Sequence, residues 1–366
     1  MHLSSIKLTQ FKNYEAYHVH FSPTVNCIVG LNGMGKTNLL DAIYYLCMCK
    51  SHFSIPDRLL VQKKLDFFRL EGHFTKKEKL LNVVAKVQPK EKKKEIELNG
   101  VPHKKLADHI GLLPIVMITP FDADLAFDGS EVRRRFLNNS LAQIDPQYLQ
   151  AELTYNRLLR QRNALLKSFA GRLVNPALLD TLDEQLSPLA KIIHDKRKAF
   201  CTDFFPVFKQ YYQIISNEQE QVACRYRSQL DGNDLAPLLK ASREKDVLLQ
   251  RTTVGTHKDD LVFTIEEQIL KKFASQGQLK SYILALKLAQ YEIVKIHKTS
   301  RPLLLLDDIF DKLDNNRVQQ LLQLLFKNDF GQIFFTDTDE QRLLSLIAPF
   351  GVKAKQLIIK NGQVVK

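Results

Sequence analysis

Alternating apolar and polar side chains occupy the first part of the chain. The alternation covers Leu3–Leu8 and Tyr17–Phe21, and the mainly apolar run Val25–Val29 follows. Alternation is typical of half-exposed strands, and a continuous apolar run is typical of a buried strand. From residue 38 to 46 the apolar side chains recur at helical spacing. The pattern therefore predicts two half-exposed strands, a buried strand, a glycine-rich turn and a helix.

Two contrasting segments follow this beginning. Residues 68–121 hold short alternating runs, the turn pair Asn99-Gly100 and a buried strand at Ile115–Ile118. These features predict an antiparallel subsheet. From 130 to 216 the apolar residues fall at helical spacing, and glycine occurs once between residues 130 and 231. That stretch is predicted to form a helical domain.

Strand and helix signals alternate again towards the C-terminus. Leu261–Ile265 predicts a strand, Gln278–Ile296 an amphipathic helix, and Gln332–Phe335 a further strand. Residues 356–365 contain the turn pair Asn361-Gly362 and predict a terminal hairpin. We therefore expect an α/β fold that the helical stretch interrupts.

The composition is that of a folded chain. Of the 366 residues, 45% are hydrophobic and 25% are charged, which is close to the globular average and excludes dominant disorder. The longest stretch without a charged or strongly polar side chain is Ile110–Ile118, whereas a membrane-spanning helix needs about 20 such residues. The N-terminus has no apolar signal core and the five cysteines are odd in number, so we expect a cytoplasmic protein.

The charge balance favours an acidic partner. Fifty-three basic and 40 acidic residues leave a net charge of +13, and such a surface attracts polyanions, nucleic acid first among them. Eight lysines against two glutamates lie between Lys76 and Lys94. The helical stretch adds further cations: Arg133, Arg134, Arg135, Arg157, Arg160, Arg162, Lys191, Lys196, Arg197 and Lys198. Aromatic residues are not interleaved with these runs, so contact with a duplex backbone or junction is expected rather than base stacking.

The glycine-rich turn carries the first chemical motif. Gly30-Leu31-Asn32-Gly33-Met34-Gly35-Lys36-Thr37 fits the phosphate-binding pattern G-x-x-x-x-G-K-[ST] and has the required strand before it and helix after it. Its backbone N–H groups and the positive helix end would hold the phosphates of ATP. Lys36 would reach the β- and γ-phosphates, and the Thr37 hydroxyl would bind Mg²⁺. The residues expected to contact ATP here are Gly30, Asn32, Gly33, Gly35, Lys36, Thr37 and Asn38.

A second motif supplies carboxylates. Pro302-Leu303-Leu304-Leu305-Leu306-Asp307-Asp308 is a short apolar strand that ends in two acids, as a Walker B strand does. Asp307 would address Mg²⁺, and Asp308 would orient or deprotonate the attacking water. In the chain, 271 positions separate Lys36 from Asp307, so a large insertion is expected between them. We predict a split nucleotide domain formed by 1–126 and 251–366, with residues 127–250 as the inserted helical domain.

A third motif precedes the C-terminal amphipathic helix. Ser275-Gln276-Gly277-Gln278 stands before it, and Phe310-Asp311-Lys312-Leu313-Asp314 follows the Walker B strand. This series resembles the signature, Walker B and D-loop of ABC-type ATPase heads. Phe11-Lys12-Asn13-Tyr14 and the segment 254–261 make the chain similar to one family in particular, the RecF family of DNA gap-repair and recombination ATPases.

The resemblance to the RecF family implies an ABC-type P-loop ATPase head with a mixed sheet, an antiparallel subsheet and an inserted α-helical domain. It also implies an ATP-dependent homodimer on DNA, in which Ser275, Gly277 and Gln278 of one copy face the triphosphate that Lys36 of the other copy holds. Loss of the γ-phosphate would then open the dimer. The partners it implies are DNA and the proteins RecR, RecO and RecA.

The sequence departs from the family pattern near the triphosphate. RecF relatives carry an arginine directly after the histidine of Lys50-Ser51-His52, whereas this chain has Phe53, and Arg58 is a candidate replacement. The segment Thr119-Pro120-Phe121-Asp122 is where the family pattern places the Q-loop switch. Thr336 and Asp337 are candidates for sensing the γ-phosphate.

Some assignments stay open. His257, Asp259 and Asp260 suit either a metal or acid–base set or, as we prefer, residues that cap the strand from Leu261. Cys47 and Cys49 are expected to be buried small hydrophobes. Two functions compete with a slowly hydrolysing DNA clamp: a structural DNA-bridging protein that binds ATP without turnover, and a transport ATPase subunit, which the basic helical insertion argues against.

Overall fold

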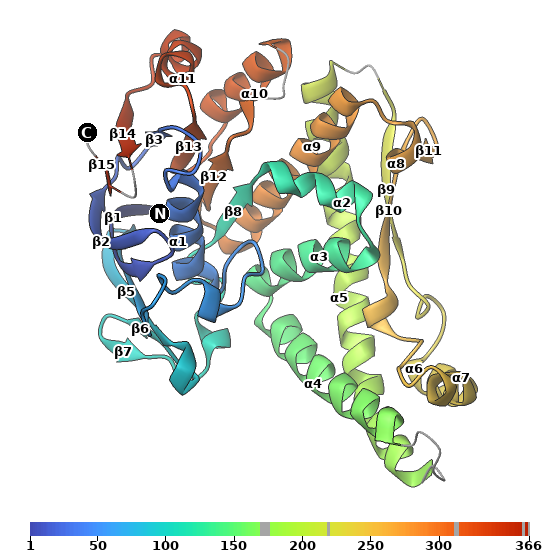
Figure 1. The fold of residues 1–366 in the computed structure, drawn as a ribbon. Helices are drawn as coiled ribbons and strands as arrows, with labels where there is room; N and C mark the ends of the chain where they lie inside the picture. Colours follow the sequence, from blue (N-terminus) through green and yellow to red (C-terminus); the bar gives the residue numbers. More distant parts are fainter. Residues whose placement is uncertain (169–175, 218–219, 311–314, 361–362, 365–366) are drawn as a thin grey trace. The chain divides into compact units, whose positions relative to one another are not determined.

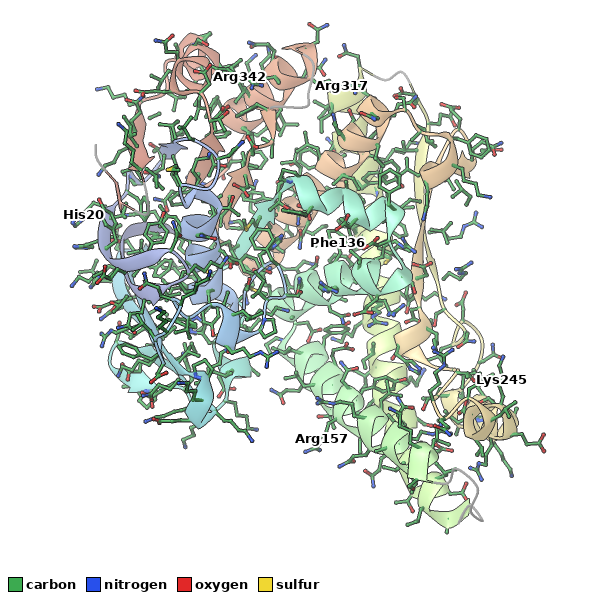
Figure 2. All side chains as sticks on the ribbon, viewed as in Figure 1. His20, Phe136, Arg157, Lys245, Arg317 and Arg342 are labelled. Atoms are coloured by element: carbon green, nitrogen blue, oxygen red, sulfur yellow. The ribbon has the colours of Figure 1, made fainter. Side chains whose placement is uncertain are left out.

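The computed structural model describes residues 1–168, 176–217, 220–310, 315–360 and 363–364 (Figures 1 and 2). The chain forms two compact units, which we call the head unit and the insertion unit. The head unit comprises Met1–Asp122, Tyr211–Glu218 and Lys280–Lys366, and the insertion unit comprises Ala123–Gln210 and Gln219–Leu279. The predicted boundaries at 126/127 and 250/251 differ from this division chiefly because residues 251–279 belong to the insertion unit.

An antiparallel sheet forms one layer of the head unit. Its order is β2-β1-β4-β5-β6-β7. The strands are β1 (His2–Phe11), β2 (Tyr14–His20), β4 (Phe68–Lys76), β5 (Lys79–Gln88), β6 (Lys93–Leu98) and β7 (Val101–Pro102). The alternating runs of the sequence are thus confirmed as strands. The two N-terminal strands extend the predicted subsheet, because β1 pairs with β4.

A second, mainly parallel sheet has the order β15-β14-β3-β13-β12-β8. The strands are β3 (Val25–Val29), β8 (Ile115–Ile118), β12 (Leu303–Asp307), β13 (Ile333–Asp337), β14 (Ala354–Lys360) and β15 (Gln363–Val364). The terminal hairpin is confirmed by the antiparallel pair β14 and β15, whereas its turn, 361–362, lies outside the described residues.

The prediction that Ile115–Ile118 joins the antiparallel subsheet is wrong. This strand, β8, pairs in parallel with β12, with Ile115 opposite Leu303. All four of its residues are buried, as a strand covered on both faces requires. Periodicity indicated a buried strand, but it does not indicate which strand lies beside it.

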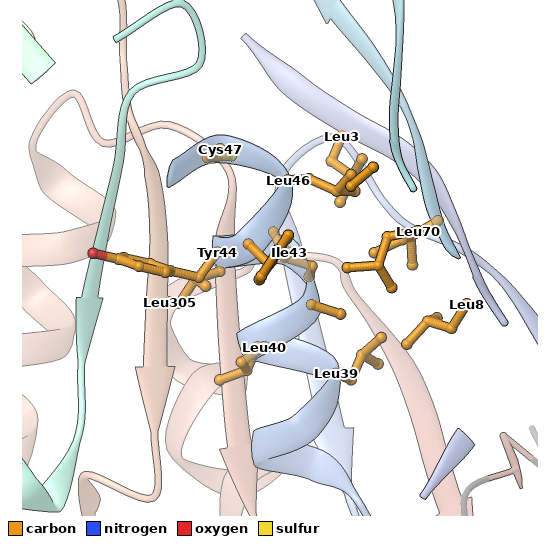
Figure 3. Packing of buried hydrophobic residues seen from close by; sticks show 14 of the residues in the cluster. Leu3, Leu8, Leu39, Leu40, Ile43, Tyr44, Leu46, Cys47, Leu70 and Leu305 are labelled. Atoms are coloured by element: carbon orange, nitrogen blue, oxygen red, sulfur yellow. The ribbon is translucent and has the colours of Figure 1, made fainter. Parts of the chain in front are cut away.

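Helix α1 (Lys36–Met48) lies in the core of the head unit (Figure 3). Leu39, Ile43 and Leu46 belong to one buried cluster with Leu70 of the antiparallel sheet and Leu305 of the parallel sheet. Of the 13 helical residues, 11 are buried. Packing against both sheets therefore fixes where the helix begins. The remaining helices of the head unit include most of α9 (Gln276–Lys298), α10 (Asn315–Lys327), α11 (Glu340–Ile347) and the short helices η1 (Asp57–Leu59), η2 (Pro89–Glu91), η3 (Leu106–Asp108) and η7 (Ala348–Phe350).

Helices dominate the insertion unit, which confirms the helical prediction for residues 130–168 and 176–216, whereas 169–175 lie outside the described residues. The main helices are α3 (Ser130–Ile144), α4 (Pro146–Ser168) and α5 (Pro176–Ser216), whose last residues belong to the head unit. Phe136 of α3 packs against Phe204 of α5, with ring centroids 5.7 Å apart (Figure 2). The shorter elements are α2 (Asp124–Phe127), α6 (Leu235–Ala241), α7 (Arg243–Leu248), α8 (Leu270–Phe273) and η5 (Thr256–Lys258), and η4 (Pro120–Ala123) crosses the boundary from the head unit.

The insertion unit also contains a small sheet, which the sequence did not predict. Its order is β11-β10-β9, with β9 (Val222–Arg227), β10 (Asp260–Ile265) and β11 (Gln268–Ile269). The strand expected at Leu261–Ile265 is confirmed, but its expected place in the head is wrong, because β10 pairs with β9 and β11. Buried and exposed residues alternate along β9, so one face of this strand is buried and the opposite face is exposed. Among the described residues, no helix has the length and apolar composition needed to cross a membrane.

Candidate nucleotide-binding site

The glycine-rich turn connects the end of β3 to the start of α1. The Lys36 side chain folds back over this turn, and its Nζ donates to the carbonyl oxygens of Gly30 at 2.5 Å and Leu31 at 3.2 Å. Asn32 and Gly33 are exposed, whereas Lys36 is buried. These two carbonyl groups therefore hold the ammonium at the loop where a phosphate is expected.

Gly35 is required by the local backbone. Its φ of 117° lies in the region that L side chains rarely adopt, and it directly precedes the first residue of α1. A Cβ atom at this position would lie 2.6 Å from Asn13 Nδ2 and 3.0 Å from the Tyr14 hydroxyl. The glycine therefore permits both the turn and the close approach of a neighbouring segment.

That neighbouring segment is the turn between β1 and β2. Asn13 Nδ2 donates to the Met34 carbonyl oxygen at 3.1 Å, and Asn38 Nδ2 donates to Asn13 Oδ1 at 2.7 Å. The Tyr14 hydroxyl donates to the Gly35 carbonyl oxygen at 3.0 Å, and burial raises the pKa of this tyrosine well above its ordinary value. Sequence reasoning used Asn13 and Tyr14 only as family landmarks and missed that they brace the phosphate loop.

Asp307 joins the loop to the Walker B strand. The Thr37 hydroxyl donates to Asp307 Oδ2 at 2.9 Å, and the Thr336 hydroxyl donates to Asp307 Oδ1 at 2.7 Å. Parallel pairing of β3, β13 and β12 brings the three elements together at one edge of the sheet. Burial raises the pKa of Asp307, while the hydrogen bonds from Thr336 and Thr37 and the charge of Lys36 lower it.

The donor set at this edge fits Mg²⁺. Magnesium prefers hard oxygen ligands, keeps several waters and is usually held by one or two carboxylates together with substrate phosphates, so a hydroxyl and a carboxylate beside a phosphate loop suit it. Thr37 is partly exposed and Asp307 is 3% exposed, and their oxygens already lie within hydrogen-bond distance. These are the two residues that the sequence assigned to the metal.

Thr336 links both Walker B acids. Its hydroxyl oxygen accepts from the Asp308 N–H at 2.9 Å while its proton goes to Asp307. Asp308 has a φ of 48°, an uncommon value for a residue with a side chain, so its backbone turns sharply after the strand. Asp337 is buried and its Oδ1 accepts from the Asp339 N–H at 2.9 Å, which holds the turn before α11. Residues 311–314 of the expected D-loop lie outside the described residues.

The signature segment begins helix α9. Ser275 and Gln276 are exposed, and Gly277 is the second residue of the helix. Ser275 and Gln278 cap the helix reciprocally, because the Gln278 N–H donates to Ser275 Oγ at 3.2 Å and the Ser275 N–H donates to Gln278 Oε1 at 2.7 Å. Ser275 belongs to the insertion unit, whereas Lys36 and Asp307 belong to the head unit.

Phe53, at the position where the family resemblance predicts an arginine, lies beside a cation. Lys12 Nζ is 5.4 Å from the Phe53 ring centroid and 2.7 Å from Asp41 Oδ2. Asp41 is fully buried on α1 and also accepts from the Ser51 hydroxyl and the His52 N–H, each at 2.8 Å. The segment around Phe53 is thus anchored to the helix that follows the phosphate loop. Arg58 is exposed, and its role as a replacement stays a prediction.

The expected switch segment 119–122 is tied to the signature helix. Asp122 Oδ2 accepts from the Thr119 N–H at 2.6 Å, and Asp122 Oδ1 lies 3.1 Å from Nζ of Lys287 on α9. Both charged side chains are at most one-tenth exposed. The segment and the helix therefore share a buried ion pair within the head unit.

Two of the cations assigned to the DNA-facing set are buried, so that part of the prediction is wrong. Arg162 is fully buried and pairs with Asp183 and Asp246 at 2.6 and 2.7 Å. Arg197 is 1% exposed and pairs with Asp259 at 2.7 Å. A buried guanidinium requires carboxylate partners, and these partners come from distant parts of the chain.

The histidine and acids near 257–260 have structural partners. His257 contacts the Tyr155 hydroxyl at 3.0 Å and the Thr252 carbonyl oxygen at 3.1 Å, and burial lowers its pKa to about 4. Asp260 is the first residue of β10. Within the described ranges, no group of three or more histidine, cysteine or acidic residues is arranged to hold a metal ion. Cys47 and Cys49 are buried, as expected.

A buried strand, a phosphate loop, an acidic strand end and a capped signature helix together define an ABC-type ATPase head. The family model described as the RecF/RecN/SMC N terminal domain matches residues 2–360. Smc heads share this fold alone: one bound to the C-winged helix domain of ScpA has a TM-score of 0.58 and 14% identity, and it covers 100% of this chain and 96% of that chain.

Within this class the chain belongs to the RecF family. It is 41% identical to the DNA replication and repair protein RecF of Parabacteroides distasonis over 364 residues, which cover 100% of this chain and 99% of the relative. It is equally similar to the RecF of Porphyromonas gingivalis ATCC 33277, 41% over 366 residues and the full length of both. The solved structure of the recombination mediator protein RecF with ATP, in the RecFOR pathway, has a TM-score of 0.89 and 28% identity, and it covers 99% of this chain and 96% of that chain.

Proposed function

We propose that this protein is an ATP-dependent DNA-binding clamp of RecF type that acts in DNA replication and recombinational gap repair. The observation that carries the proposal is the convergence of Lys36, Thr37 and Asp307 at one sheet edge, in a chain whose full length matches DNA replication and repair proteins of the RecF family. The net charge of +13 supports a polyanionic partner.

ATP binding is proposed to use the loop as it stands. The exposed backbone of residues 31–33 and the N-terminus of α1 offer N–H groups to the phosphates, and the Lys36 ammonium would exchange its bonds to Gly30 and Leu31 for phosphate oxygens. Thr37 and Asp307 would hold Mg²⁺, which neutralises charge on the phosphate oxygens when it is bound. Asn38 is already oriented by its bond to Asn13.

Hydrolysis is proposed to depend on Asp308. This carboxylate would orient or deprotonate the attacking water, with Thr336 fixing its backbone next to Asp307. Aspartate is one methylene shorter than the glutamate common in ABC-type ATPases, so we expect slow turnover. A steady-state rate above about 10 s⁻¹, the median for enzymes, would contradict this expectation.

Dimerisation is proposed to complete the site. The triphosphate held by Lys36 of one copy would be contacted by Ser275, Gly277 and Gln278 of a second copy. The dimer would therefore persist until hydrolysis removes the γ-phosphate. The exposure of Ser275 and its position at a helix start support this role, because a helix N-terminus favours an anion. By family, RecR, RecO and RecA would be its partners in the cytoplasm.

Sedimentation of the full chain tests the proposal. With Mg²⁺ and a nonhydrolysable ATP analogue the wild type should form dimers on gapped duplex, whereas ADP should leave monomers. Lys36→Ala and Ser275→Arg should both abolish this pairing. Ser345→Arg, which adds the same charge at an exposed position of α11, is the matched control and should pair normally.

Three outcomes would count against the proposal. Pairing retained by Ser275→Arg would exclude the shared site, and pairing lost by Ser345→Arg would show a general charge effect. If single-turnover phosphate release were equally absent from the wild type and Asp308→Asn, the protein would be an ATP-binding DNA bridge without turnover.

A further inference from the structure

A cluster of cations surrounds the segment 251–260 of the insertion unit. The segment ends in Asp259 and Asp260, packs against α3 and strand β9, and is hydrogen-bonded to Tyr155 and Asn163 of α4. Asp259 Oδ2 accepts from Arg197 Nη1 at 2.7 Å and from the Tyr226 hydroxyl at 2.5 Å. Arg197 and Asp259 are each only 1% exposed, so this buried ion pair holds the segment in place.

Arg134 contacts the backbone of the same segment and is held in one orientation. Its Nη1 donates to the Asp259 carbonyl oxygen at 2.8 Å and to Ser130 Oγ at 2.6 Å, which engages both N–H groups of that nitrogen. Both acceptors are neutral, and among the described residues no carboxylate lies within ion-pair distance of Arg134. The donors on Nε and Nη2 therefore remain for a ligand, in the fork geometry that suits two oxygens of one phosphate.

Lys258 belongs to the segment that Arg134 contacts. It immediately precedes Asp259, it is exposed, and it forms no ion pair with a described residue. Partial burial lowers the pKa of Lys258, and the charges of Arg251 and Arg134 lower it further, while Asp246 opposes the shift. Both arginines therefore lie within electrostatic range of Lys258. Like charges held together in this way favour a bound anion.

The neighbouring acid does not supply that anion. Asp260 is shared by two guanidinium groups, since Arg133 Nε lies 2.6 Å from Oδ1 and Arg227 Nη2 lies 3.3 Å from Oδ2. Arg227 is 70% exposed on the outer side of β9, so the positive surface continues beyond the cluster. An extended polyanion fits such a surface better than a single small ion.

We infer that Arg134 and Lys258 form a binding site for a backbone phosphate of duplex DNA. The inference rests on the proposed function for the identity of the polyanion and adds the residues that hold it. The Arg134 fork would take two phosphate oxygens, and Lys258 would contribute a second, mobile cation. Contacts from these donors to phosphate oxygens would position the duplex and carry no base-sequence information of their own.

Binding of a fluorescently labelled duplex to the full chain tests the site, with Mg²⁺ and a nonhydrolysable ATP analogue present and the salt concentration varied. Lys258→Gln should weaken binding about tenfold and reduce the slope of log affinity against log salt by about 0.9. Arg134→Lys keeps the charge but removes the fork, so it should weaken affinity while the salt slope changes little. Lys245→Gln, on α7, is the control for charge alone and should match the wild type (Figure 2).

The outcomes separate the site from the proposed function. If the wild type bound the duplex but Lys258→Gln kept its affinity and salt slope, the site would be wrong while the clamp function stood. An equal loss in Lys245→Gln would also overturn the site, because it would show general electrostatics. If the wild type itself failed to bind the duplex with ATP analogue bound, the proposed function would fail. Nucleotide binding by each variant, measured in the same samples, shows that the head unit is folded.

Discussion

The Thr37 hydroxyl lies 2.9 Å from Asp307 Oδ2, although 270 positions separate the two residues in the chain. The contact depends on parallel pairing of β3, β13 and β12, which aligns the ends of strands from the two extremes of the sequence. It joins the two Walker motifs within one copy without any residue of the insertion unit, so nucleotide binding by a single copy can be tested apart from the proposed Ser275 contact of a second copy.

Asp307 is expected to weaken the fold while it serves the site. Its pKa is raised in the folded state, so the folded chain binds this proton more tightly than the unfolded chain does. Stability therefore falls as pH rises from the ordinary aspartate pKa through the raised one, and the deprotonated form at neutral pH carries the full penalty. Asp307→Asn should raise the melting temperature of the nucleotide-free protein at pH 7.

The same variant should lose the stabilisation that ATP provides with Mg²⁺. At about 100 times its dissociation constant, a ligand of the folded state stabilises the wild type by about 2.7 kcal/mol. Thermal unfolding with and without MgATP measures both effects, and Asp108→Asn, an exposed acid, serves as the control. A lower melting temperature of nucleotide-free Asp307→Asn would contradict the prediction.

Gly35→Ala should disrupt the nucleotide site. The added Cβ would lie 2.6 Å from Asn13 Nδ2 at a φ of 117°, so the residue meets both a contact and a backbone strain of about 1–2 kcal/mol. We expect a strong loss of ATP affinity in a titration with a fluorescent analogue. Gly100→Ala has a φ of 79° but open space around its Cβ, so it isolates the strain and should keep ATP affinity. Equal affinities in the two variants would count against the role of Gly35.

The Lys287–Asp122 pair should contribute far more to stability than a less buried pair on the same helix. Lys287→Met leaves a buried carboxylate without its cation, and loss of one partner of such a pair costs about 3–5 kcal/mol. Lys295 pairs with Glu292 at 3.1 Å in a more exposed position, so Lys295→Met should cost about 0.5 kcal/mol. Urea unfolding measures both free energies. A similar cost for both variants would show that the Asp122 carboxylate remains solvated.

Local motifs predicted the elements that meet at the candidate nucleotide site, because their order is given in the sequence. A buried strand, Gly30–Thr37 and an amphipathic helix fix the phosphate loop, and Asp307 follows a run of four leucines. Strand partners were less predictable, since periodicity reports burial and not pairing. Ile115–Ile118 and Leu261–Ile265 were therefore recognised as strands but assigned to the wrong sheets.

Charge was the least informative signal for single residues. Composition placed Arg162 and Arg197 with the surface cations, whereas both are buried against aspartates. The partner Asp246 is 84 positions from Arg162, so no local window connects them. The fold, and not the residue type, decides which cations face the solvent.

Arg162→Ala should therefore destabilise the insertion unit without acting as a DNA-contact variant. Removing this side chain leaves Asp246 without its cation and the Thr252 hydroxyl without its donor, whereas Asp183 keeps Arg243 at 3.2 Å. The expected cost is about 3–5 kcal/mol. Arg157, on the exposed side of the same helix, is the matched position, and Arg157→Ala should cost less than about 0.5 kcal/mol. Urea unfolding together with duplex titration separates the two roles. An Arg162→Ala protein with wild-type stability and weakened DNA binding would show that this guanidinium faces the duplex after all.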